Sequence, residues 1–151
     1  MTHLALLDGN AGSDSAERTA GRQKLVALCD QGKFRQITEN LLPVLIHPDR
    51  VAEAEFVAAI FDMADEVGPQ GFKDQQAALM SRIDSVADLP RIKCPTLVLV
   101  GRQDILTPPE MSQQMHEGIA GSKLTFIEDC GHLSTMERPE AVNDALRIWL
   151  G

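Results

Sequence analysis

The chain has 151 residues, 44% of them hydrophobic, which is enough for one core and favours a globular protein. Its 14 Lys and Arg residues are outnumbered by 22 Asp and Glu residues, and the net charge of −8 argues against nucleic acid or an anionic membrane surface as a partner. The three cysteines form no C-x-x-C pair and no apolar stretch approaches 18 residues, so we expect reduced thiols in a cytoplasmic protein.

The first half of the chain is predicted to be one short strand followed by helices. Residues 4–7 form an apolar run that ends in turn-forming residues, as at the end of a strand. From residue 15 to residue 82 the apolar positions recur at helical spacing. Asp14 and Glu17 have the spacing of a capping box, and Val67-Gly68-Pro69 is expected to end the third helix.

After residue 90 the pattern alternates between strand and helix. Residues 96–100 form a continuous apolar run, which is typical of a parallel strand covered on both faces. A helix over 109–118, a strand over 123–127 and a helix from Pro139 to Leu150 are predicted to follow. This alternation indicates an α/β fold with about three parallel strands, flanking helices and right-handed crossovers.

Two polar side chains follow these strands. Asp104 comes shortly after Gly101, which ends the strand over 96–100, and His132 follows the strand over 123–127. The carboxyl ends of parallel strands meet at one sheet edge, so a carboxylate and an imidazole are expected side by side. Together they would form two members of an acid–base–nucleophile relay.

Other residues of the same region offer three further assignments. Asp8, at the end of the first strand, is a rival acid, although its ordinary role would be in a turn. Cys130 could be taken for a nucleophile, but no strand-to-helix elbow surrounds it and a packed thiol is expected. Asp129, Cys130 and His132 lack a further donor at suitable spacing, so we expect no metal site there.

Two motifs carry a resemblance to a known family. They are Pro95-Thr96-Leu97-Val98-Leu99-Val100-Gly101-x-x-Asp104-x-x-x-Pro108 and Cys130-Gly131-His132-x-x-x-x-Glu137-x-Pro139. In order and spacing they resemble the C-terminal part of the α/β-hydrolase family. The resemblance implies a partial α/β-hydrolase fold, with core segments at 1–14 and 86–151 and a helical cap inserted at 15–85.

The resemblance implies no organic cofactor and no metal, and it implies roles for particular residues. His132 would take a proton from the nucleophile and return it to the leaving group, while Asp104 would hold one imidazole nitrogen. Ile105 and Leu133, beside these two, would lie near a small ester-like or lactone substrate. Glu137 is expected at the start of the last helix, where a carboxylate suits the helix dipole.

The family's nucleophile lies in a G-x-S-x-G motif, which these 151 residues do not contain. We therefore interpret the chain as a C-terminal, truncated or split part of a hydrolase and expect no turnover from the isolated chain, because it lacks an oxyanion hole. The alternative hypothesis is a non-catalytic association module. It would pair with a second copy or with an N-terminal partner through the exposed edge of the strand over 4–7.

Overall fold

The computed structural model describes residues 1–151, which form two compact units. One unit contains the sheet and consists of residues 1–11, 44–48 and 85–151; the other is helical and consists of residues 12–43 and 49–84. The sheet unit is thus discontinuous in sequence, with the helical unit interrupting it twice.

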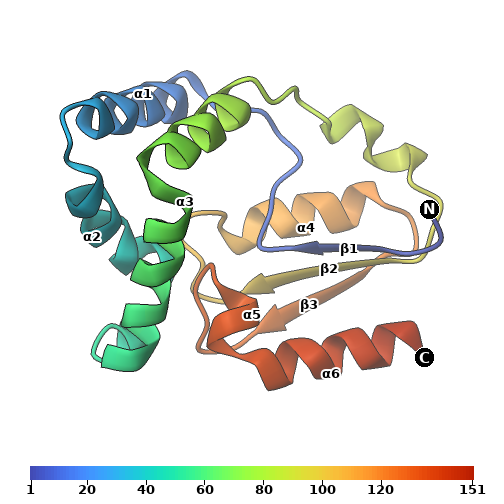
Figure 1. The fold of residues 1–151 in the computed structure, drawn as a ribbon. Helices are drawn as coiled ribbons and strands as arrows, with labels where there is room; N and C mark the ends of the chain where they lie inside the picture. The colour runs from blue at the N-terminus through green and yellow to red at the C-terminus, as the bar shows by residue number, and fades with distance from the viewer. The chain divides into compact units, whose positions relative to one another are not determined.

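The sheet has three parallel strands in the order β1-β2-β3, which confirms the predicted α/β class (Figure 1). These are β1 (Leu4–Leu7), β2 (Thr96–Gly101) and β3 (Lys123–Ile127). Leu4 lies opposite Thr96, and Leu97 lies opposite Lys123. The central strand β2 pairs on both sides and every one of its residues is buried, whereas β1 and β3 form the edges.

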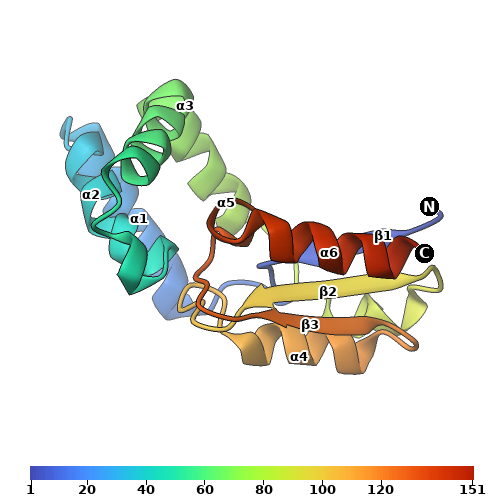
Figure 2. The same ribbon diagram turned by 90° about the horizontal axis from the view of Figure 1, so that it is seen from below.

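Helices cover both faces of this sheet, with α4 (Pro109–Gly118) on one side and α6 (Pro139–Leu150) on the other (Figure 2). Side chains of successive strand residues point to opposite faces. Accordingly Leu97 and Leu99 pack in a cluster with Val142 of α6, while Val98 packs with Met115 of α4. This burial on both faces explains why the sequence of β2 is an unbroken run of apolar residues.

Three short helices were not predicted from the sequence. They are η1 (Pro48–Arg50), η2 (Val86–Arg91) and α5 (Ser134–Glu137). Segments of one or two turns are too short to show a period in the apolar residues. Of these, α5 matters most for the site because it follows His132 directly.

The helical unit contains α1 (Ala16–Asp30), most of α2 (Phe34–Leu45) and α3 (Ala54–Met80). The predicted stop at Val67-Gly68-Pro69 is a kink within α3, where Gly68 leaves the helical region with φ 68° and ψ 173°. Helix α1 packs against α3 across this kink, and the Cys29 thiol donates a hydrogen bond to the Pro69 carbonyl at 3.4 Å.

The predicted capping box at the start of α1 is wrong. Ser15 is the N-cap, and its hydroxyl accepts a hydrogen bond from the N–H of Arg18 at 3.2 Å. Asp14 instead forms an ion pair with Arg22, whose hydrogen bond holds the pKa of this carboxyl below its usual value. Arg22 also donates to Gln76 Oε1 at 3.0 Å, so this network joins α1 to α3.

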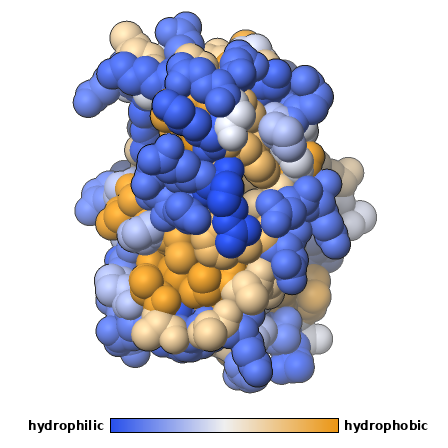
Figure 3. All heavy atoms as spheres, turned by 60° about the vertical axis from the view of Figure 1, so that its left-hand side comes forward, coloured by the Kyte–Doolittle hydropathy of each residue, from blue (hydrophilic) through white to orange (hydrophobic).

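Most of the surface in Figure 3 is hydrophilic, with hydrophobic residues gathered in patches between the charged ones. In the helical unit the exposed large apolar residues are Val51, Met63, Val67 and Ile83. None of the helices combines the length and the apolar composition that a membrane-spanning segment requires.

Candidate active site

The loops after β2 and β3 bring Asp104 and His132 into direct contact. The distance from Asp104 Oδ2 to His132 Nδ1 is 2.8 Å. Two backbone hydrogen bonds join these loops, from Arg102 to Ile127 at 2.8 Å and from Gln103 to Cys130 at 2.9 Å. The sequence interpretation that placed both side chains at one sheet edge therefore agrees with the geometry, while their catalytic roles stay predictions.

Asp104 is held by four hydrogen bonds. Oδ1 accepts the N–H groups of Leu106 and Thr107, each at 2.9 Å, and Oδ2 accepts the Thr107 hydroxyl at 2.8 Å as well as His132. Burial acts to raise the pKa of Asp104, but the hydrogen bonds from His132 and Thr107 outweigh it, and the pKa lies below its usual value. The group is therefore an ionised acceptor at neutral pH.

This environment decides which imidazole nitrogen carries the proton. An ionised carboxylate can only accept, so the 2.8 Å contact requires the proton to be on His132 Nδ1. In the neutral ring Nε2 then keeps a lone pair. The His132 side chain is 21% exposed whereas that of Asp104 is fully buried, so solvent reaches the histidine and not its acid.

Asp8, the rival acid, has other partners. Its backbone lies in the left-handed region at φ 47°, and its Oδ1 accepts the N–H of Gly101 at 3.1 Å. Its Oδ2 accepts both the N–H and the hydroxyl of Ser134. Burial raises the pKa of Asp8, partly offset by the bonds from Ser134. Asp8 thus connects the ends of β1, β2 and α5, while the imidazole contact belongs to Asp104.

Glu137 is the residue that sequence reasoning misjudged. It does not lie at the start of the last helix but is the last residue of α5, with only 2% of its surface exposed. Its Oε1 accepts the N–H groups of Gly131 at 3.0 Å and Leu133 at 3.2 Å, and its Oε2 accepts the N–H of His47 at 2.7 Å. The single turn of α5 directs this side chain back beneath the His132 loop.

The two residues predicted to lie near substrate differ in exposure. Ile105, next to Asp104, is 61% exposed. Leu133, next to His132, is half-buried. Each adjoins one member of the pair along the chain, and their contact with a substrate stays a prediction.

Cys130 is fully buried in the cluster between the sheet and α6. Burial, reinforced by the negative charges of Glu137 and Asp8, raises the pKa of its thiol to about 12. The thiolate that a nucleophile requires is therefore not formed at neutral pH. No group of three or more His, Cys, Asp or Glu side chains in the chain could hold a metal ion.

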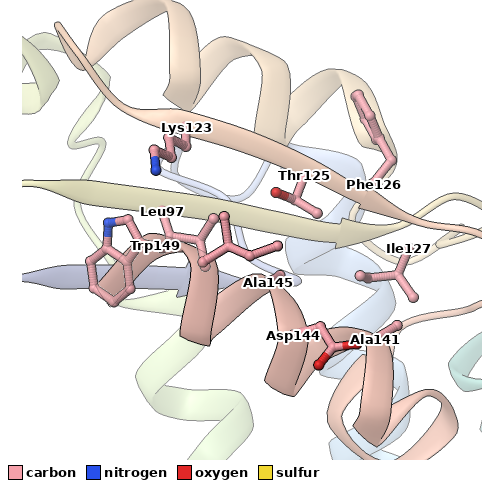
Figure 4. A pocket seen from close by; sticks show the side chains of 10 residues that line it. Leu97, Lys123, Thr125, Phe126, Ile127, Ala141, Asp144, Ala145 and Trp149 are labelled. Atoms are coloured by element: carbon pink, nitrogen blue, oxygen red, sulfur yellow. The ribbon is translucent and has the colours of Figure 1, made fainter. Parts of the chain in front are cut away.

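A groove of about 390 Å³ lies elsewhere in the sheet unit, between β3 and α6. Figure 4 shows Trp149 and Ala145 of α6 facing Leu97, with Lys123 and Asp144 at the margins. Asp104 and His132 do not line this groove. It is therefore separate from the acid–base pair.

Known proteins resemble this chain in sequence and in structure. A family model described as the alpha/beta hydrolase family matches residues 5–145. A proline iminopeptidase from Lactobacillus crispatus is 40% identical over 62 residues, covering 41% of this chain and 21% of that protein. The bifunctional epoxide hydrolase 2 of Mus musculus is 42% identical over 60 residues, covering 40% of this chain and 11% of that protein.

Among solved structures, a thermophilic esterase from Thermogutta terrifontis is similar over 98% of this chain, with a TM-score of 0.90 and 34% sequence identity. The match covers 55% of the esterase, so this chain spans about half the length of that enzyme. Because the family model covers most of the chain, and the parallel sheet with its flanking helices agrees with it, the chain belongs to the alpha/beta hydrolase family.

Proposed function

We propose that this chain supplies the acid and the base of a hydrolytic relay. The observation that carries the proposal is the 2.8 Å contact between buried Asp104 and His132 Nδ1. With Nδ1–H given to the carboxylate, Nε2 is the nitrogen that accepts a proton from the nucleophile. Asp104 stabilises the imidazolium that results and does not take the proton itself.

The nucleophile of this relay would come from residues outside these 151, since the sequence contains no G-x-S-x-G. In the proposed reaction a serine hydroxyl attacks the acyl carbon while its proton moves to His132 Nε2. The leaving alcohol then takes that proton and an acyl-enzyme remains. Water attacks the acyl-enzyme in the same way, giving its proton to His132, and the serine takes that proton as it leaves, which releases the acid. The chain would thus act as the C-terminal segment of a longer or two-part hydrolase.

The proposed substrate is a small, uncharged or weakly charged ester or lactone. The similarity to the Thermogutta terrifontis esterase supports this choice, as does the exposed apolar Ile105 beside the acid. For residues 15–85 we propose the role of a cap over the substrate. The separate compactness of the helical unit supports that role, because an inserted cap needs a core of its own.

The test is a chimera in which this chain replaces the matching 55% of the Thermogutta terrifontis esterase, assayed with short p-nitrophenyl esters. We expect hydrolysis by the chimera, and a loss of roughly 10²–10⁴-fold in the rate when His132→Ala removes the general base. Asp104→Asn should cost a similar factor because it no longer fixes the tautomer. Asp144→Asn, an exposed change on α6, is the matched control and should leave the rate unchanged.

An active chimera that hydrolyses esters equally fast with His132→Ala would refute the proposal. A second measurement does not depend on the chimera. In the isolated chain, the ring ¹⁵N shifts of His132 report which nitrogen is protonated. A ring protonated on Nε2 alone would contradict the proposed base.

Association through β1 is a second candidate function. The strand pairs only with β2, and its four residues are half-buried. The N–H groups of Leu4 and Asp8 bond to the β2 side, so the N–H of Ala5 points away from β2. Ala5→Pro should therefore abolish edge pairing and keep the sheet. Sedimentation that finds the unsubstituted chain monomeric at every concentration would exclude pairing of two copies through this edge.

A further inference from the structure

The loop that carries His132 has a fixed acceptor for each of its backbone N–H groups. Those of Gly131 and Leu133 bond to Glu137, that of His132 bonds to the Leu45 carbonyl at 2.9 Å, and that of Ser134 bonds to Asp8. Loops in general leave such groups to water. Here the buried carboxylate of Glu137, the half-buried carboxylate of Asp8 and one carbonyl replace the water.

Glu137 makes the contacts that flank the imidazole. Its Oε1 accepts from the residue before His132 and from the residue after it. The remaining oxygen, Oε2, accepts the N–H of His47 at 2.7 Å, the shortest of the three bonds. Hydrogen bonds to a carboxylate are shorter and stronger than those between neutral groups. One side chain therefore fixes both sides of the histidine and the segment 44–48.

Packing leaves this loop little space in which to move. A Cβ added to Gly131 would lie 2.7 Å from the carbonyl carbon of Ile46 and 2.8 Å from the nitrogen of His47. The backbone of the loop is therefore in close contact with the backbone of the segment 44–48. Glu137 bonds to both backbones and holds them at this distance.

We propose that Glu137 is a positioning residue for His132. By fixing the backbone on both sides of the imidazole, it keeps Nδ1 at Asp104 and keeps Nε2 oriented for proton transfer. This inference rests on the proposed role of His132 as the base. It adds to the acid–base pair a second carboxylate, which is bonded to the backbone on both sides of the imidazole.

Glu137→Gln tests the proposal with almost no change of shape. The amide replaces one oxygen by a donor, which must face either His47 or the two loop N–H groups. In either orientation at least one backbone bond is lost. We expect hydrogen exchange of the affected amides to accelerate about ten- to a hundredfold, the factor for one bond to a charged acceptor. The ring ¹H and ¹⁵N signals of His132 should also shift in the Glu137→Gln variant.

Glu140→Gln is the matched control, since Glu140 is exposed in the first turn of α6 and loses the same charge. It should leave both the exchange rates and the His132 signals unchanged. A role of Glu137 in general stability alone would lower the unfolding temperature without moving the ring signals of the folded protein. Folded Glu137→Gln with unshifted His132 signals would therefore overturn the proposal.

Two further measurements test the positioning role of Glu137 if Glu137→Gln does not fold. Glu137→Asp keeps the charge but is one methylene shorter, so the His132 signals should shift in this variant too. In the unsubstituted chain, the N–H groups of Gly131 and Leu133 should exchange as slowly as those of β2; exchange at the rate of exposed loops would overturn the proposal. Both readouts need only the chain itself, so they stand even if the chimera shows no hydrolysis.

Discussion

Gly101 is a position where one added methyl group should strongly destabilise the folded protein. A Cβ at this residue would lie 1.9 Å from the Gly131 carbonyl oxygen and 2.6 Å from that of Cys130. Both atoms belong to the backbone, so no side chain can rotate out of the way. The loop after β3 would have to move, although the Gly131 N–H is bonded to Glu137 and the Cys130 carbonyl to Gln103.

The expected loss in the free energy of unfolding follows from this contact. Overpacking costs roughly 1–3 kcal/mol, and the rigid neighbours place Gly101→Ala at about 3 kcal/mol or more. For a chain of this size each kcal/mol lowers Tm by about 2–4 °C, so we expect a fall of about 6–12 °C. Thermal unfolding followed by the fluorescence of Trp149, the only tryptophan, reports on the sheet unit.

Gly9→Ala is the matched control in the same unit. The nearest atom to its added Cβ is the Leu7 carbonyl oxygen at 3.6 Å, an ordinary contact, and the residue does not have a positive φ. This change should be neutral, or should stabilise the unit by about 0.4–1 kcal/mol through the unfolded state. A Gly101→Ala variant as stable as Gly9→Ala would refute the packing argument.

Three other predictions concern the thiols, the acid and the core. With a thiol reagent at pH 8, only the half-buried Cys94 should react before unfolding, since Cys130 is fully buried with a pKa of about 12; a second fast thiol would contradict this. The pKa of Asp104 lies below 3.8 in the folded state, so its ionised form stabilises the protein above that value and the contribution is lost as the pH falls through the folded pKa. Urea unfolding should accordingly show Asp104→Asn to be less stable at neutral pH and less sensitive to acid than the unsubstituted chain. Leu99→Ala, at a fully buried position, should cost about 2–5 kcal/mol in the same assay, whereas Ile148→Ala, at a position 74% exposed, should change stability by under about 0.5 kcal/mol.

The sequence was sufficient for the strands and for the meeting of Asp104 with His132. An unbroken apolar run and a glycine stop are local features, and parallel pairing then brings the strand ends to one edge. The sequence also predicted the position of the break at Gly68, because a residue before proline avoids the helical region, although the structure has a kink within α3 there and not the predicted helix end.

Glu137 and Asp14 could not be assigned from local pattern. Glu137 acquires its partners through a single turn of helix and through the distant segment 44–48, and neither leaves a periodic signal. The spacing of Gly131, His132 and Glu137 within one motif was the only indication. Asp14 had the local spacing for a cap, but its carboxylate instead forms an ion pair with Arg22 of α1, the helix that follows it.

The discontinuity of the sheet unit has a consequence for the order of folding. Leu4 must find Thr96 across the whole helical unit, whereas Leu97 and Lys123 are joined by one short crossover. Closing a long loop is slow and costs more entropy than closing a short one. Pairing of β2 with β3 should thus come early. Strand β1 should join the sheet later, once the packing of α1 against α3 has brought the two ends of the helical unit closer together.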